Sequence, residues 1–220
     1  LRARQVLNTM PHRINRRQAS LAPLAWLGTA YLAGCTTTTH NMISTATSID
    51  HLPWSRQAAI YEVNLRQFTP EGTLAAFEAH LPRLAQMGVG ILWFMPIQPI
   101  GVKHRKGGLG SYYSIADYTA VNPEFGTLAD FRRIVARAHA LGMKVILDWV
   151  ANHTAWDHPW VLQHKERYKL DAKGEVFAVT FLAGTPDVEY WTDVVGLNYA
   201  ETSLWPAMTD AMAKIGRAHV

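Results

Sequence analysis

The sequence predicts an α/β fold built on a parallel sheet, and three observations support that prediction. Three apolar segments, at residues 58–65, 88–97 and 143–150, have the length and composition of buried strands. Helical patterns that end at glycine separate them. Strands that alternate with helices of about 10 to 15 residues are typical of right-handed crossover units and a parallel sheet.

Two helices are expected between these strands. The first ends at Gly88, and Pro82 within it is expected to kink or restart the helix. The second has the clearest local signal, because Thr127 and Asp130 have capping-box spacing. Apolar residues then line one face of this second helix as far as Gly142.

The third strand predicts where a ligand binds. Its continuous apolar run is typical of a parallel strand covered on both faces. The run ends in Asp148, which Asn152 and His153 follow closely. Ligands of α/β folds bind at the carboxyl ends of such strands, so we expect these three side chains at a functional site.

The regular alternation ends after the third strand. Residues 158–198 mix Pro, Gly, aromatic and acidic residues, and a structureless loop of that length is unusual in a compact domain. We interpret this stretch as a small inserted subdomain, followed by a final helix at residues 201–214. Residues 215–220 match one reading frame of a common sequencing adapter. We expect them to be a foreign tail on a truncated gene product.

The N-terminal 35 residues have the layout of a signal peptide. Five of the 21 basic residues and none of the 17 acidic ones lie there, so the rest of the chain has 16 basic and 17 acidic residues. No basic cluster on the expected folded domain predicts nucleic-acid binding. After the expected initiator Met10, basic residues precede an apolar stretch at 21–33, which is shorter than the ~20 residues of a membrane span. Residues 1–9 are expected to be untranslated upstream sequence.

The end of this segment, Leu-Ala-Gly-Cys at residues 32–35, resembles a bacterial lipobox. That resemblance implies cleavage before Cys35 and lipidation of the cysteine. A plain secretory signal with an incidental cysteine is the alternative. Cys35 is the only cysteine in the chain, so no disulfide within the chain can form. Residues 36–50 are rich in Thr and Ser and are expected to form a tether to a lipid anchor at the bacterial cell envelope.

Several motifs together resemble the α-amylase family of glycoside hydrolases, whose catalytic domain is a (β/α)8 barrel. Residues 148–153 (DWVANH) are similar to the family signature after the third barrel strand. Residues 110–118 (GSYYSIADY) and 121–127 (VNPEFGT) resemble the segment that carries a sugar-stacking tyrosine, which the family pattern assigns to Tyr113. Residues 196–198 (GLN) resemble the short motif near the end of the family's domain B.

The resemblance implies a partial (β/α)8 TIM barrel. Residues 51–214 would form its N-terminal part, with the first three βα units of the barrel. A domain B-like insertion would occupy residues 155–200, after the third strand.

The resemblance also implies roles for four residues. Tyr113 would stack beneath the sugar in the cleavage subsite, and His153 would hydrogen-bond that sugar. Asn152 would hold a calcium ion shared with domain B, and Asp148 would be a supporting carboxylate rather than a nucleophile. Aromatic faces bind the apolar faces of glucose, and polar groups at strand ends bind the hydroxyls. The structural alternatives are a histidine satisfied at a strand end, a packing tyrosine and an asparagine that caps a turn.

The two carboxylates that a retaining glycosidase needs, about 5 to 5.5 Å apart, are expected outside this chain. The family places its catalytic Asp, Glu and further Asp after the fourth, fifth and seventh strands. We therefore expect the full-length protein to hydrolyse α-glucans such as starch and maltooligosaccharides with retention, and the 220 residues alone to be inactive. The alternatives are a transglycosylase or trehalose-forming member of the family, a noncatalytic glycan-binding lipoprotein and an unrelated α/β protein.

Overall fold

The computed structural model describes residues 51–216, which belong to one compact unit. The signal peptide, Cys35 and the tether expected in residues 1–50 lie outside the described residues, as do residues 217–220. The expectations for those segments stay predictions. Of the helices in the described part, none is both long and apolar enough to cross a membrane.

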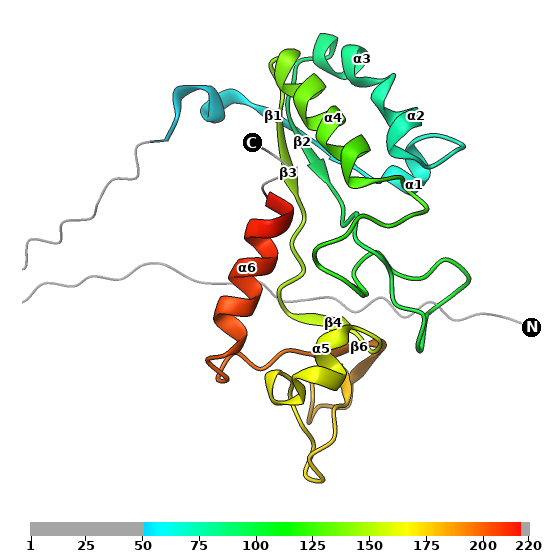
Figure 1. The fold of residues 1–220 in the computed structure, drawn as a ribbon, viewed down its shortest axis with the longest axis vertical. Coiled ribbons are helices and arrows are strands. Elements are labelled where there is room, and N and C mark those ends of the chain that lie inside the picture. The colour runs from blue at the N-terminus through cyan, green and yellow to red at the C-terminus, as the bar shows by residue number, and fades with distance from the viewer. Residues whose placement is uncertain (1–50, 217–220) are drawn as a thin grey trace, which may run out of the picture. The chain divides into compact units, whose positions relative to one another are not determined.

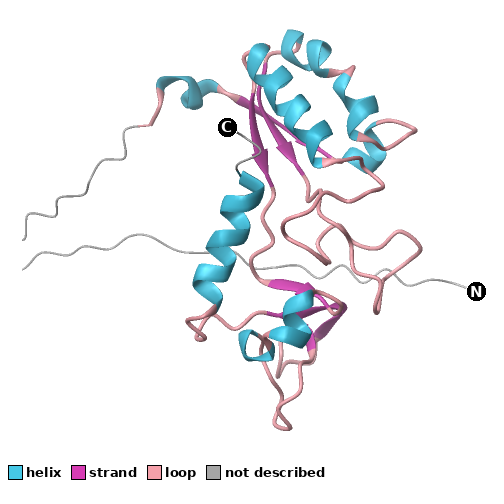
Figure 2. Ribbon diagram, in the orientation of Figure 1, coloured by secondary structure: helices cyan, strands magenta, loops and turns pink. Residues whose placement is uncertain are grey.

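A three-stranded parallel sheet carries the first half of the described chain (Figures 1 and 2). The strands occur in the order β1-β2-β3. Their bounds fall inside the three predicted segments: β1 (Ala59–Val63), β2 (Val89–Phe94) and β3 (Lys144–Leu147). Val63 pairs with Phe94, and Phe94 pairs with Leu147, so the three strands end at the same level. The predicted parallel α/β architecture is confirmed.

The two faces of this sheet have different environments, because side chains alternate along a strand. The residues on one face pack into the core with the helices, namely Tyr61, Val63, Leu92, Phe94, Val145 and Leu147. On the other face, Ile60 and Ile146 remain 59% and 43% exposed. The described residues therefore cover one face of the sheet, not both as the apolar strand composition predicted. In a closed barrel, side chains from further strands fill that inner face.

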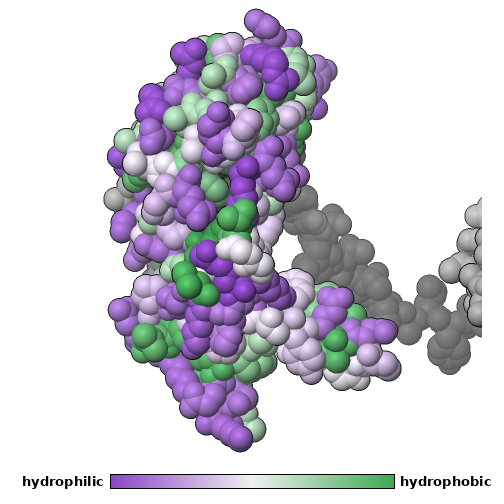
Figure 3. Space-filling view, turned by 90° about the vertical axis from the view of Figure 1, so that its right-hand side faces the viewer, coloured by the Kyte–Doolittle hydropathy of each residue, from purple (hydrophilic) through white to green (hydrophobic). Residues whose placement is uncertain are grey.

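Helices cover the buried face of the sheet (Figure 1). They are α1 (Leu65–Phe68), α2 (Leu74–Glu78), α3 (Leu81–Gln86) and α4 (Leu128–Ala140). The ring of Phe94 lies edge-to-face against Phe77 and Phe131, with centroids 5.2 and 5.8 Å apart. Seen from the side of α2 and α3, the hydrophobic residues on the surface form small separate groups among hydrophilic ones (Figure 3).

The predicted helix signals are confirmed. Pro82 lies in the first turn of α3, where proline needs no hydrogen-bond partner, so the expected single helix restarts there. The Thr127 side chain accepts from the Asp130 amide, and the Asp130 side chain bonds the Thr127 amide in return. Gly88 and Gly142 follow their helices with φ of 83° and 81°, the left-handed conformation that ends a helix.

A small antiparallel sheet follows β3, as the predicted insertion requires. Its order is β4-β6-β5. The elements after β3 are β4 (His153–Ala155), α5 (Pro159–Gln163), the 3-10 helix η2 (Lys165–Arg167), β5 (Ala178–Phe181), β6 (Glu189–Gly196) and α6 (Leu204–Gly216). Another 3-10 helix, η1 (Pro53–Gln57), precedes β1. The final helix begins three residues later than expected and includes Ile215 and Gly216 of the segment expected to be foreign. A second core joins α6 to the insertion through Tyr118, Tyr168 and Val195.

Candidate functional site

Asp148 lies at the carboxyl end of the parallel sheet. Its amide donates to the carbonyl of Phe94 at 2.9 Å, which extends the ladder one residue beyond β3. Leu147 points into the helical layer, so the alternation of side chains directs Asp148 to the open face. The strand thus delivers a carboxylate to the edge where α/β folds bind ligands.

The loop before α4 brings Tyr113 to this carboxylate. The Tyr113 hydroxyl donates to Oδ2 of Asp148 at 3.1 Å. Arg66 fixes the loop, because its guanidinium lies 4.3 Å from the ring centroid of Tyr112 and donates to the carbonyl of Gly110 at 3.1 Å. These contacts join the ends of β1 and β3 to one loop.

His153 is the buried member of the site, with 7% of its surface exposed. The side-chain nitrogen of Asn152 donates to Nδ1 of His153 at 3.0 Å. The fully buried Tyr118 holds the same segment, since its hydroxyl lies 2.7 Å from the Val150 carbonyl and 3.0 Å from the His153 carbonyl. Tyr118 was missed as a positioning residue, although it belongs to one of the family-like motifs.

Burial favours the uncharged forms of His153 and Tyr113. Burial lowers the pKa of His153, although a hydrogen bond to the Tyr113 main chain and the nearby Asp193 act in the opposite direction. Burial and the hydrogen bond to Asp148 raise the pKa of Tyr113 to about 12. At neutral pH the imidazole is therefore neutral and the phenol keeps its proton. Neither group is poised for proton transfer near pH 7, and both suit binding of a neutral polar ligand.

Tyr113 and His153 line one cleft of about 470 Å³. Its other lining residues are Lys106, Ser111, Trp191, Asp193 and Val194. The ring of His153 lies edge-on to Trp191, with centroids 5.9 Å apart. The Nζ of Lys106 lies 3.2 Å from Oδ1 of Asp193, so an ion pair joins the loop before Tyr113 to strand β6.

Trp191 and Asp193 are site residues that the sequence analysis missed. Strand β5 pairs with β6 at Val195 and then at Trp191, so residues 192–194 form an irregularity opposite β5. Such bulges redirect side chains and are frequent beside functional sites. Ser114 secures this one by donating to the carbonyl of Asp193 at 3.0 Å. The adjacent aromatic residues Tyr190 and Trp191 were the only local signal in the sequence for a site in this segment.

Asn152 is the residue that the family resemblance assigns to calcium. Ca²⁺ takes about six to eight oxygen ligands. Within residues 51–216, no group of three or more His, Cys, Asp or Glu side chains could hold a metal ion. The side-chain nitrogen of Asn152 contacts Nδ1 of His153. Calcium binding through Asn152 stays a prediction and enters no step below.

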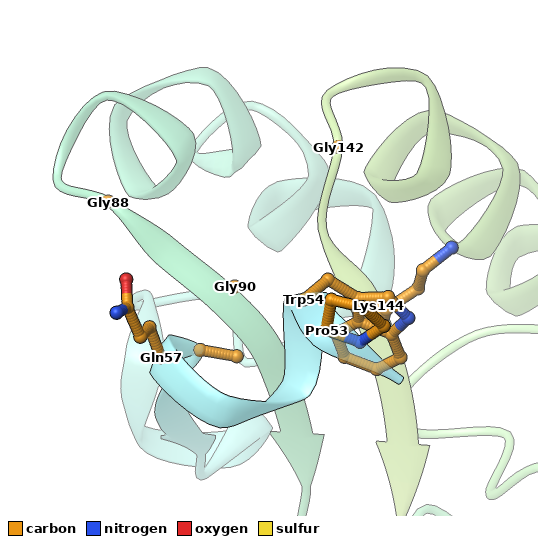
Figure 4. A pocket seen from close by; sticks show the side chains of 8 residues that line it. Pro53, Trp54, Gln57, Gly88, Gly90, Gly142 and Lys144 are labelled. Carbon is orange, nitrogen blue, oxygen red and sulfur yellow. The ribbon is translucent and has the colours of Figure 1, made fainter. Parts of the chain in front are cut away.

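A second pocket lies at the opposite end of the sheet (Figure 4). It measures about 510 Å³ and is lined by Trp54, Lys144 and the glycines that precede β2 and β3. The Nζ of Lys144 lies 5.7 Å from the ring centroid of Trp54, which occupies part of the space. This is the amino end of the strands, where barrel residues serve stability, so we place the candidate site at the carboxyl end.

Parallel strands with helices on one face and a cleft at their carboxyl ends match the first units of a (β/α)8 barrel. The catalytic-domain model of the α-amylase family matches residues 33–189. The chain therefore belongs to the α-amylase family, as its motifs predicted, and the partial barrel with an insertion after the third strand is confirmed.

Individual relatives agree with this assignment. An α-1,4-glucan:maltose-1-phosphate maltosyltransferase from Rhodospirillum rubrum is 37% identical over 174 residues, which cover 70% of this chain and 24% of that protein. An α-amylase from Lactobacillus plantarum superposes with a TM-score of 0.65 at 42% identity, over 72% of this chain and 36% of that one. A maltogenic α-amylase from Thermotoga neapolitana superposes with a TM-score of 0.62 at 36% identity, over 71% of this chain and 35% of that one. The chain thus spans about a quarter to a third of these proteins.

Proposed function

We propose that this chain forms the sugar-binding part of a glycoside hydrolase that acts on α-glucans with retention in the full-length protein. The observation that carries the proposal is that Tyr113 and the buried His153 line one cleft, with the Tyr113 hydroxyl bonded to Asp148. An aromatic ring and uncharged hydrogen-bonding groups are what a pyranose ring requires.

Each residue has a definite task in this proposal. The Tyr113 ring, which is 36% exposed, stacks on the apolar face of a glucose unit while its hydroxyl stays bonded to Asp148. The other oxygen of Asp148 and the imidazole of His153 bind sugar hydroxyls. The family resemblance gives Asp148 a supporting role and not that of the nucleophile. The two carboxylates of the double displacement would come from strands outside this chain.

A transferase of the same family is the second candidate. The observation in its favour is the name of the Rhodospirillum rubrum relative, a maltosyltransferase. A hydrolase passes the glycosyl unit to water, and a transferase passes it to another acceptor. The Tyr113 and His153 contacts hold the donor sugar, so they suit both reactions.

The test is to incubate the full-length protein that contains this chain with maltotriose and to follow the products by proton NMR. A retaining hydrolase releases the α-anomer first, whereas a transferase yields longer oligosaccharides. Tyr113→Ala is expected to lower kcat/KM at least about tenfold through the loss of the stacked ring. Binding without turnover would support a glycan-binding protein instead. If maltotriose is neither bound nor consumed, the proposal fails.

The anchor and location form a separate part of the proposal. Residues 32–35 support lipidation of Cys35 and attachment to the bacterial cell envelope. Growth of the producing bacterium with an alkyne-labelled fatty acid would label the wild-type protein and leave Cys35→Ser unlabelled. Equal labelling of both proteins would contradict the lipobox interpretation.

A further inference from the structure

The amino end of the parallel sheet presents a second surface, opposite the candidate site. Three segments lie there: residues 51–58 before β1, 83–88 before β2 and 137–144 before β3. The pocket with Trp54, Gly88, Gly142 and Lys144 in its lining joins all three segments (Figure 4). We call these three segments together the amino-end face.

The amino-end face carries positive charge without acidic residues. Each segment contains Lys or Arg, and none contains Asp or Glu. Its four basic residues are all exposed, and no ion pair among residues 51–216 includes any of them. They are Arg56, Arg83, Arg137 and Lys144. Glu78 lines a small pocket with Arg137, but its carboxylate is paired with Arg133 at 2.8 Å.

The helix ends account for part of this charge. Arg83 and Arg137 lie in the last turns of α3 and α4, where a basic side chain balances the partial negative charge of the helix end. Arg56 and Lys144 lie in no α-helix, since Arg56 belongs to η1 and Lys144 begins β3. Two of the four positive charges therefore need another explanation.

Exposed apolar side chains lie among these charges. Each segment contributes at least one, and Trp54, Met87 and Leu141 are 46%, 58% and 37% exposed. Leu52 is also exposed. The Nζ of Lys144 lies 5.7 Å from the ring centroid of Trp54, so a cation and an aromatic ring are neighbours. Tryptophan and aliphatic side chains beside Lys and Arg are typical of protein surfaces that lie in the interface of a lipid bilayer.

We propose that the amino-end face binds an anionic phospholipid membrane. The basic side chains would contact the lipid headgroups, and Trp54, Met87 and Leu141 would reach the boundary with the acyl chains. The expected tether, residues 36–50, joins this face directly in the sequence, so a lipid on Cys35 would act on the same membrane. The cleft at the opposite end of the strands would stay open to glucans. The biological setting rests on the proposed envelope location, but binding to vesicles tests the face without the lipid.

The test is sedimentation of the full-length protein that contains this chain with vesicles of phosphatidylcholine, alone or mixed equally with phosphatidylglycerol. Every variant carries Cys35→Ser, so no lipid is attached. The wild-type face is expected to favour the anionic vesicles. The double substitution Arg56→Gln and Lys144→Gln removes the two charges outside the α-helices and is expected to weaken this binding at least about tenfold.

The double substitution Lys103→Gln and Lys173→Gln is the matched control. It removes two exposed charges as well, but from loops beyond the carboxyl ends of the strands, and it is expected to bind vesicles like the wild type. The expected signal peptide, residues 1–34, is also basic. Because all variants share that segment, the comparison between variants isolates the amino-end face.

A second measurement reports on the apolar part of the face. Lipids that carry bromine on their acyl chains quench the fluorescence of a tryptophan that contacts them. Trp54→Phe is expected to remove part of the quenching that anionic vesicles cause. Trp205→Phe is the control, because it removes an indole that is 58% exposed at the start of α6, and it is expected to leave the quenching unchanged.

The outcomes separate this inference from the proposed function. Equal losses in the two double variants would contradict it, because they would indicate a response to net charge alone. Unchanged quenching in Trp54→Phe would also contradict it. Self-association that Arg56→Gln with Lys144→Gln abolishes, without vesicle binding, would assign the face to a second copy of the chain instead. Turnover of maltotriose is expected to be the same in this variant as in the wild type, so its loss in both proteins would contradict the proposed function alone.

Discussion

The hydroxyl of Tyr113 donates to Oδ2 of Asp148 at 3.1 Å, across 35 residues of sequence. This contact links a surface loop to the last ladder position of β3. It orients a half-exposed aromatic ring at the carboxyl end of the sheet. The site thus depends on the position of this loop. Two other parts of the chain determine that position: Arg66 near β1 and Asp148 after β3.

Removal of the hydroxyl alone tests this link. Tyr113→Phe keeps the stacking ring and loses one hydrogen bond to a carboxylate, so maltotriose binding is expected to weaken roughly threefold to tenfold. Tyr113→Ala loses the ring as well and is expected to weaken it further. Calorimetric titration measures both variants. Wild-type affinity in Tyr113→Ala would show that the ring does not contact the sugar.

Tyr118 is expected to stabilise the segment that carries His153. Its hydroxyl serves the buried carbonyls of Val150 and His153, so Tyr118→Phe leaves both without that donor. We expect a loss of about 1 to 3 kcal/mol in the free energy of unfolding, measured with urea. Tyr190→Phe alters a 61% exposed ring and is expected to change stability by less than about 0.5 kcal/mol. Equal effects of the two substitutions would refute the role of Tyr118.

The buried His158 is expected to make the folded protein less stable in acid. It is buried, and its Nδ1 accepts from the amide of Trp160 at 3.1 Å. Burial lowers its pKa from 6.5 to about 4, although Asp117 and Asp157 act in the opposite direction. The unfolded chain then binds the proton at a higher pH than the folded chain. Stability therefore falls as the pH drops from about 6.5 towards 4, by about 2 kcal/mol at pH 5.

His158→Asn separates this effect from the loss of the cap. An asparagine oxygen can accept the same amide hydrogen bond at the start of α5 but does not titrate. Urea unfolding at pH 7.5 and at pH 5 is expected to show most of the acid loss in the wild type and a smaller loss in the variant. The residual loss is assigned to His153, whose pKa is also lowered. Equal acid losses in the two proteins would contradict the assignment to His158.

Gly101 is expected to tolerate no side chain. An added Cβ would overlap the Ala155 Cβ and lie 2.7 Å from Oδ1 of Asp157. The same Asp157 holds the loop by accepting from the amide of Val102 at 2.7 Å. Gly101→Ala is expected to lower the free energy of unfolding by about 1 to 3 kcal/mol, which thermal unfolding detects as a lower melting temperature. Gly108→Ala, in the same loop with nothing within 4 Å, is the control and is expected to match the wild type.

Local signals in the sequence predicted the framework well. The apolar runs, the capping box at Thr127 and Asp130, and the restart at Pro82 depend on neighbours a few residues apart. The apolar run before Asp148 predicted, for the same reason, that this side chain lies at the carboxyl end of the sheet. Within residues 51–216 helices cover only one face of the sheet, because the strands whose side chains fill the inner face of a closed barrel are not among its three.

The rest of the site depends on contacts between distant residues. Trp191 and Asp193 reach the cleft only because β6 departs from regular pairing with β5. The ion pair of Lys106 and Asp193 joins segments 87 residues apart, and no spacing pattern indicates it. Tertiary contacts of this kind are decided by packing of the insertion against the barrel segment.

The central claim is that the cleft lined by Tyr113 and His153 binds a glucose unit of an α-glucan. The most direct measurement is the NMR spectrum of the histidine imidazoles during a maltotriose titration of the full chain. The resonances of His153 are expected to shift and saturate, whereas those of the exposed His139 on α4 stay constant. A saturating titration that leaves the His153 resonances unchanged, or no change at any histidine, would contradict the claim.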